Sequence, residues 1–144
     1  MFEKILYPTD FSDVSKKALD YIKQLKKVGG RMIVLLHVID ERHLQTVERF
    51  VSEHTRKLER EILKHVSAMM DPVENELKQS GFEVKSRIEV GIPMREILRV
   101  EEEEDVSVIV IGSHGKSNLQ EMFLGSVSEK VTRKCKKPIL IVKR

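Results

Sequence analysis

The sequence contains few of the residues on which several classes of protein depend. Tryptophan is absent and only 5% of the 144 residues are aromatic, which argues against the base-stacking platforms of single-strand nucleic-acid binders. The single cysteine, Cys135, excludes an internal disulfide and a cysteine-based metal cluster. No signal peptide pattern heads the chain, and no apolar run approaches the roughly 20 residues that a membrane span needs. We therefore expect a cytoplasmic protein that binds neither membranes nor nucleic acid.

The residues that are present indicate a globular protein with a charged surface. Charged residues make up 34% of the chain and hydrophobic residues 40%, a balance that allows a sizeable core. Acidic and basic residues are interspersed and the net charge is only +3, so the chain lacks the basic stripe of a nucleic-acid binder. The length suits one domain, and we expect residues 1–144 to fold as a single unit.

Four short apolar segments have the composition of buried β-strands, and a fifth segment alternates polar and apolar residues. They are residues 5–7, 32–39, 108–111 and 139–142, with the alternating segment at 82–90. Amphipathic helical patterns separate these segments, and strands that alternate with helices favour a parallel sheet. We predict an α/β fold: an open five-stranded, doubly wound, Rossmann-like parallel sheet, strand order 3-2-1-4-5, with helices on both faces.

Three local features carry expectations of their own. Pro72 lies inside a long amphipathic pattern between about residue 44 and residue 80, so we expect a break or kink near Asp71. The acidic run at residues 101–105 lies at the C-terminus of a predicted helix, residues 94–103, and we interpret it as a solvated helix end because metal sites need converging oxygens. His37 lies inside a predicted strand and is better explained as a hydrogen-bonded core residue than as a metal ligand.

A polar loop in the last third of the chain is a candidate phosphate site. The predicted strand at residues 108–111 ends at Gly112, the loop carries a second glycine at Gly115, and Gly125 and Ser126 open a helical pattern. Glycines let the backbone approach an anion, and the dipole of the following helix favours negative charge. The alternative is that these glycines are only turn residues.

The spacing of these glycines differs from that of a P-loop. Gly115, Lys116 and Ser117 look like the end of that motif, but the residue five positions before Gly115 is Val110, inside the predicted strand. The pattern present is instead Gly112-x2-Gly115-x9-Gly125-Ser126.

A second part of the candidate site follows the first strand, which Pro8 ends. Thr9 and Asp10 lie in a turn rich in helix-capping residues. Open α/β sheets bind ligands at the carboxyl ends of their strands, where Asp10, the end of the second strand near Val38 and the Gly112 loop are expected to meet. Asp10 alone is better explained as a turn residue that satisfies backbone N–H groups, but the convergence of three segments favours a nucleotide site.

Several segments resemble the universal stress protein family, and most of all its ATP-binding, archaeal-type members. They are KILYPTDFS at residues 4–12, LLHVID at 35–40, GSHGKSN at 112–118, LGSVSEKV at 124–131 and KPILIVKR at 137–144. The resemblance covers residues 4–144, and the glycine pattern matches the ATP-binding pattern of that family in full. It implies one nucleotide-binding domain that acts as a regulatory or stress-response switch, with at most slow ATP hydrolysis.

The resemblance also implies which residues contact the nucleotide. Asp10 would contact the ribose or the adenine edge, beside an adenosine pocket lined by neighbouring residues of the first two strands. The loop amides and the Ser126 hydroxyl would bind the phosphates, and His114 would lie beside the nucleotide. The full set of expected contact residues is Pro8, Thr9, Asp10, Val38, Ile111, Gly112, His114, Gly115, Gly125, Ser126, Val127 and Ser128.

The same resemblance implies a ligand and partners. The ligand would be ATP, or ADP or AMP, with Mg²⁺ or Mn²⁺ held mainly through the phosphates, because no protein carboxylate is an obvious metal ligand. A homodimer would form through the C-terminal strand Ile139–Val142, which agrees with the need to pair an apolar edge strand. A further protein partner is implied but not identified.

Two other functions stay open, and no residue is assigned a catalytic role. The first is an enzyme of a related nucleotide-binding α/β fold, such as a nucleotidyl transferase or an ATP pyrophosphatase. Such enzymes usually carry a phosphate loop or paired histidines after the first strand, where this chain has residues 8–12, PTDFS. The second is a dimeric scaffold that binds no nucleotide, against which the intact glycine pattern argues. Fast phosphoryl transfer is not expected, because a Walker lysine and an arginine finger are missing.

Overall fold

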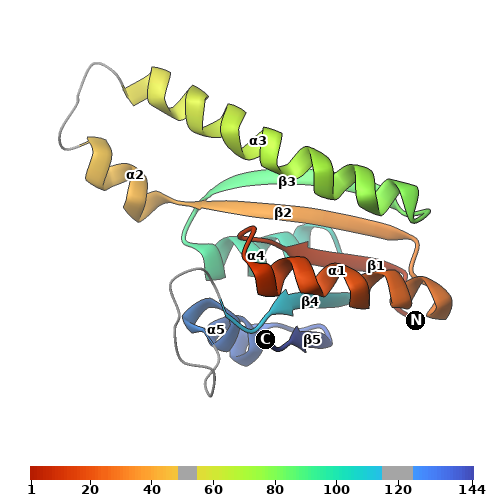
Figure 1. The fold of residues 1–144 in the computed structure, drawn as a ribbon. Helices are drawn as coiled ribbons and strands as arrows, with labels where there is room; N and C mark the ends of the chain where they lie inside the picture. Colours follow the sequence, from red (N-terminus) through yellow and green to blue (C-terminus); the bar gives the residue numbers. More distant parts are fainter. Residues whose placement is uncertain (49–54, 115–124) are drawn as a thin grey trace.

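The computed structural model describes residues 1–48, 55–114 and 125–144 (Figure 1). Five strands form one sheet: β1 Lys4–Pro8, β2 Met32–Asp40, β3 Glu83–Gly91, β4 Val108–Gly112 and β5 Ile139–Val142. Their order is β3-β2-β1-β4-β5, and each neighbouring pair is parallel. The predicted α/β fold and strand order are confirmed.

Helices cover both faces of this sheet, as predicted. The helices are α1 Asp13–Leu25, α2 Glu41–Glu48, α3 Thr55–Gln79, α4 Pro93–Glu103 and α5 Ser126–Lys134, and a 3₁₀ turn, Lys26–Val28, follows α1. Figure 1 shows α1 and α3 on one face, with α4 and α5 on the opposite face. None of the helices in the described part of the chain is long and apolar enough to cross a bilayer.

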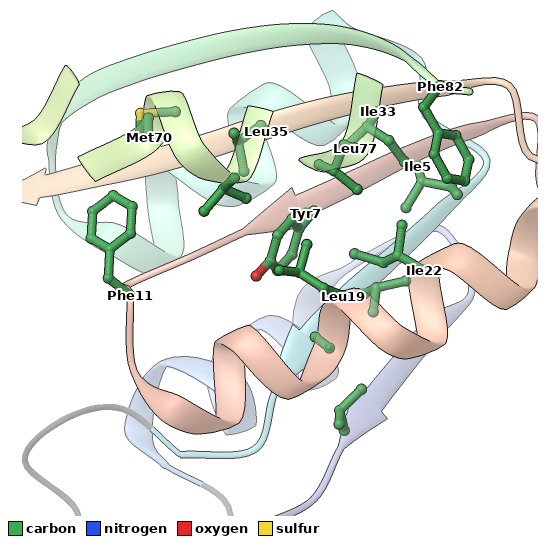
Figure 2. Packing of buried hydrophobic residues seen from close by; sticks show 14 of the residues in the cluster. Ile5, Tyr7, Phe11, Leu19, Ile22, Ile33, Leu35, Met70, Leu77 and Phe82 are labelled. Atoms are coloured by element: carbon green, nitrogen blue, oxygen red, sulfur yellow. The ribbon is translucent and has the colours of Figure 1, made fainter. Parts of the chain in front are cut away.

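The central strand β1 contributes side chains to two separate hydrophobic cores. Ile5 and Tyr7 pack with α1 and α3, whereas Leu6 packs with α4 and α5. Figure 2 shows Tyr7 beside Leu19 of α1. Burial on both faces explains why this strand is uninterruptedly apolar in the sequence. Each fully buried side chain of this size adds about 1.5–3 kcal/mol of hydrophobic stabilisation.

The helix break expected near Asp71 is wrong. Helix α3 continues through Pro72 to its end at Gln79. Apolar side chains on both sides of the proline are buried in one core: Val66, Met70, Val73 and Leu77. Packing of this stripe holds the helix together although proline removes one backbone hydrogen bond.

The acidic run at the end of α4 is only partly solvated, so the expectation of a solvated helix end is wrong for two of its residues. Glu101 is 3% exposed and Glu104 is 8% exposed. The Oε1 atom of Glu101 accepts the N–H groups of Lys136 and Lys137, each at 2.8 Å. Glu101 and Glu104 are three residues apart and therefore lie on the same face of the helix end. This spacing directs both carboxylates toward the protein interior.

Glu104 joins three elements through a cluster of ion pairs. Its carboxylate lies 2.6 Å from Lys85 Nζ, 2.9 Å from Arg87 Nη1 and 3.2 Å from Lys4 Nζ. The hydrogen bond from Lys85, supported by those from Lys4 and Arg87, lowers the pKa of Glu104 from 4.5 to about 2 against the opposing effect of burial. The cluster therefore ties β1 and β3 to the end of α4.

Replacement of Glu104 tests this cluster. We expect Glu104→Gln to lower the free energy of unfolding at neutral pH by roughly 1–3 kcal/mol, because the cations around it lose their anionic partner. A depressed folded-state pKa means that the stabilisation is complete above about pH 5 and is lost as the pH falls toward 2. Urea denaturation at pH 7 and at pH 3 measures both effects.

The control for this experiment is Glu102→Gln, since the Glu102 side chain is 74% exposed and its ion pair with Lys136 is long, at 3.5 Å. This variant is expected to change stability by less than about 0.5 kcal/mol. If Glu104→Gln lost stability in acid as steeply as the unmodified protein, the role assigned to Glu104 would be wrong.

Candidate functional site

Four segments meet at the carboxyl edge of the sheet, where the sequence predicts the site. They are the loop after β1, the end of β2, residues 112–114 after β4 and the N-terminus of α5 (Figure 1). Backbone pairing fixes this arrangement: Pro8 lies opposite Leu36 in the β1–β2 ladder, and Thr9 N–H donates to Leu36 O at 2.8 Å. On the other side of β1, Gly112 lies opposite Val142 in the β4–β5 ladder.

Thr9 organises the loop after β1. The residue is 6% exposed, and its Oγ1 accepts the Phe11 N–H at 3.0 Å and the Ser15 hydroxyl at 2.7 Å. Its carbonyl oxygen lies 2.7 Å from His37 Nδ1, which confirms that His37 is a hydrogen-bonded strand residue. Thr9 thus joins the loop to both α1 and β2.

Asp10 supports the start of α1, as its interpretation as a turn residue requires. Its Oδ1 accepts the Ser12 N–H at 2.9 Å, and Ser12 in turn caps α1 by accepting the Ser15 N–H at 3.2 Å. Asp10 is only half-buried, and its second oxygen has no hydrogen-bond partner among the described residues. One carboxylate oxygen therefore serves the turn, and the other is available to a ligand.

Phe11 is a feature of this edge that the sequence does not reveal. Its φ angle is +63°, in the left-handed region that residues other than glycine rarely adopt. The Phe11 ring lies 4.8 Å from the His37 ring, centroid to centroid. Strained backbone of this kind is concentrated at functional sites, and here it directs the chain from β1 into α1.

The ends of the glycine loop are held together at its base. Ser113 is fully buried; its N–H donates to Val142 O at 2.8 Å, and its carbonyl oxygen accepts the Gly125 N–H at 2.7 Å. Ser128 Oγ donates to Gly112 O at 2.7 Å. These bonds bring the end of β4 to the start of α5. Gly115, a predicted contact residue, lies outside the described residues.

Gly112 has a packing role beside its predicted binding role. A Cβ atom at this position would lie 3.1 Å from Val14 Cγ1 and 3.2 Å from Ser15 N, closer than most side-chain contacts. The glycine therefore lets the N-terminus of α1 lie directly against the end of β4. The N-terminus of α1 therefore lies beside the bonds that join the end of β4 to the start of α5.

The N-terminus of α5 has the features of an anion site. Gly125 is its N-cap and provides no side-chain acceptor. The N–H groups of the first turn, at Ser126, Val127 and Ser128, have no acceptor among the described residues. Ser126 is exposed, and the helix dipole gives this first turn a partial positive charge. Beside this turn, His114 is 5% exposed.

The remaining predicted contact residues contribute to the site mainly through their backbone. Ile111 is 6% exposed and packs in the core under α4 and α5, and Val38 and Val127 pack against the same core. Pro8 is buried at the end of β1. Two residues outside the predicted contact set hold the edge together: Ser15 through its hydroxyl bond to Thr9, and Ser113 through its backbone bonds to Val142 and Gly125.

The described side chains form no metal site of their own. No group of three or more His, Cys, Asp or Glu side chains in the described part of the chain could hold a metal ion. Phosphate oxygens are the usual partners of Mg²⁺ in such a case.

Comparison with known proteins assigns the family. The universal stress protein family matches residues 1–143. Universal stress protein MJ0577 of Methanocaldococcus jannaschii is 42% identical over all of this chain and 96% of its own length. Universal stress protein YxiE of Bacillus subtilis is 36% identical over 99% of this chain and all of its own length.

The solved structures agree with this result. The structure of MJ0577 matches all of this chain and 97% of its own with a TM-score of 0.90 and 45% identity. Two more distant universal stress proteins share the fold: one in complex with cAMP, at 20% identity and a TM-score of 0.70, and one from Archaeoglobus fulgidus in complex with dAMP, at 17% identity and a TM-score of 0.64.

The hydroxyl of Thr9 offers a test of how the edge is built. We expect Thr9→Val to lower the free energy of unfolding by roughly 1–3 kcal/mol, because the Phe11 N–H and the Ser15 hydroxyl lose a buried acceptor. Thr9→Ser keeps the hydroxyl and should cost less. Urea denaturation of the two variants decides the matter, and a valine variant as stable as the serine variant would exclude this role.

Proposed function

This chain belongs to the universal stress protein family, and on that premise we propose that it binds ATP and acts as a nucleotide-dependent switch in a regulatory or stress response. The observation that carries the proposal is the start of α5. Its first-turn amides have no acceptor among the described residues, and the loop base holds them beside the end of β4. Such an arrangement binds phosphate through backbone N–H groups and the helix dipole.

Two further observations support adenine nucleotides as the ligand. The sequence has the complete pattern Gly112-x2-Gly115-x9-Gly125-Ser126, which resembles that of ATP-binding family members. Two solved universal stress proteins are complexes with cAMP and dAMP. We extend this ligand class to the present chain, with ATP, ADP or AMP as the resident nucleotide.

Each part of the edge has a role in this proposal. The phosphates bind the amides of the α5 N-terminus and the Ser126 hydroxyl. The free oxygen of Asp10 accepts a ribose hydroxyl or an adenine N–H, and the backbone around Thr9 and Val38 borders the adenosine. Mg²⁺ or Mn²⁺ accompanies the phosphates, whose charge it offsets, because the described side chains offer it no site.

Hydrolysis is at most slow in this proposal. The sequence has no Walker lysine or arginine finger, the groups that stabilise charge in fast phosphoryl transfer. A resting state with bound nucleotide suits a cytoplasmic regulator that acts through a protein partner. Rapid turnover of ATP would favour the alternative of a nucleotidyl transferase or an ATP pyrophosphatase. Absence of nucleotide binding would favour the alternative of a dimeric scaffold.

We also propose that the chain forms a homodimer through β5. This strand pairs only with β4 in the described sheet and so lies at its edge. Its residues 139–141 are only half-buried within one chain, and an apolar edge strand that lacks a second neighbour is prone to pair with another chain.

The nucleotide content of the purified protein tests the main proposal. We expect denatured protein to release an adenine nucleotide, and ATP added with Mg²⁺ to stay intact for hours. Asp10→Asn, which keeps an oxygen for the Ser12 N–H, should weaken ATP binding about tenfold by calorimetry. Asp20→Asn, on the exposed face of α1, is the matched control. If no nucleotide is released and none binds on titration, the proposal is wrong.

Sedimentation velocity tests the dimer. We expect the unmodified protein to be a dimer at micromolar concentration and Ile141→Lys to be a monomer, because a charged side chain on β5 opposes pairing with a second copy. Circular dichroism verifies that the variant is folded, and Lys134→Gln, at an exposed position of α5, is the control. A monomeric unmodified protein would contradict this part of the proposal.

A further inference from the structure

Ser15, in the first turn of α1, uses each of its polar groups to bind a different neighbour. Its hydroxyl donates to Thr9 Oγ1 in the loop after β1 at 2.7 Å. Its carbonyl oxygen accepts the hydroxyl of Tyr7, a β1 residue, at 2.6 Å, and its N–H donates to Ser12 Oγ at 3.2 Å. Ser15 is 3% exposed and Tyr7 is fully buried, so these bonds serve the arrangement of the protein rather than direct contact with a ligand.

The helix turn that contains Ser15 lies between the two halves of the candidate site. On one side, Ser12, which caps this turn, donates its N–H to Asp10 Oδ1 at 2.9 Å. On the other side, a Cβ atom at Gly112 would lie 3.2 Å from Ser15 N, so the end of β4 packs directly against the turn. Asp10 belongs to the half suited to sugar or base, and Gly112 belongs to the half that leads to the α5 N-terminus. Ser15 is therefore the junction of the two halves.

Tyr7 fixes this junction from the hydrophobic core. Its ring packs in the core that α1 and α3 cover, beside Leu19 (Figure 2). Burial raises the pKa of the Tyr7 hydroxyl above its usual value of 10.0, so the group keeps its proton and stays a donor at neutral pH. Because side chains in a close-packed core have little freedom to move, the bond from Tyr7 to the Ser15 carbonyl oxygen sets the position of the first turn of α1 relative to β1.

We propose that Tyr7 and Ser15 are positioning residues of the candidate site, which hold the Asp10 loop and the Gly112 end of β4 at the spacing that lets one nucleotide bind both halves at once. This inference rests on the proposed function. When two parts of a ligand are linked, the second binds at a high effective concentration only if the spacing of its subsites matches the ligand. A small shift of the α1 turn would therefore weaken binding of the whole nucleotide more than binding of its adenosine part.

Two substitutions loosen the junction and leave the ligand-binding groups in place. Tyr7→Phe removes one hydroxyl and keeps the ring in the core. Ser15→Ala removes the bond to Thr9 and suits a helix at least as well as serine does. The matched controls are Tyr21→Phe, at a position of α1 that is 46% exposed, and Ser67→Ala, at an exposed position of α3.

Calorimetric titration of the full chain with ATP and with adenosine, each with Mg²⁺, tests the proposal on variants that circular dichroism shows to be folded. We expect Tyr7→Phe and Ser15→Ala each to bind ATP about fivefold more weakly and to bind adenosine within about twofold of the unmodified protein. Both control variants should match the unmodified protein for both ligands.

Three results would contradict these expectations, and they have different meanings. If both variants unfold at lower urea concentration but bind ATP as tightly as the unmodified protein, Tyr7 and Ser15 serve stability alone, and the inference is wrong while the proposed function stands. An equal loss of affinity for ATP and adenosine would also overturn it, because the bonds would then serve the Asp10 loop and not the spacing. Failure of the unmodified protein to bind ATP would overturn the proposed function itself.

Discussion

Burial of β1 on both faces is the constraint on which the rest of the structure depends. Ile5 and Tyr7 are enclosed by α1 and α3, and Leu6 is enclosed by α4 and α5. Because β1 is covered in this way, its own faces are closed to a ligand, and the polar groups of the candidate site lie at the ends of the central strands. The carboxyl edge collects the polar groups of the candidate site, and the ion pairs of Glu104 join Lys4 of β1 to Lys85 and Arg87 of β3.

The sequence predicted those parts of the molecule that depend on local pattern. Apolar runs identified four of the strands, and alternation of polar and apolar residues identified β3. The position of Asp10 and the glycine spacing after β4 indicated the carboxyl edge as the candidate site. Contacts between segments that are distant in the sequence could not be predicted from local pattern. The helix through Pro72 continues because of packing along α3, and Glu101 and Glu104 are inward-facing because cations and N–H groups from β1, β3 and the segment before β5 meet them. No sequence pattern signals the left-handed backbone of Phe11, which follows from the closure of the loop by Thr9.

The candidate site and the edge strand share backbone hydrogen bonds. Ser113 donates to Val142 at the end of β5 and accepts from Gly125 at the start of α5. One residue therefore links the loop base to the strand through which we propose that two chains pair. A ligand bound at the loop base and a partner paired with β5 would act on the same short segment of backbone, and thermodynamic linkage requires any such influence to be mutual.

The contact at Gly112 has a consequence for how the motif changes among related chains. A side chain at position 112 would press on Val14 and on the backbone of Ser15. The glycine is therefore needed for the close packing of α1 against β4 as much as for any contact with a ligand. A smaller residue at position 14 would relieve only the contact with the Val14 side chain, so a chain with a larger residue at 112 would need its first helix displaced by a few tenths of an ångström. If a relative lacks this glycine, its first helix must lie in a shifted position. Sequence comparison alone would interpret the same change as the loss of a binding motif.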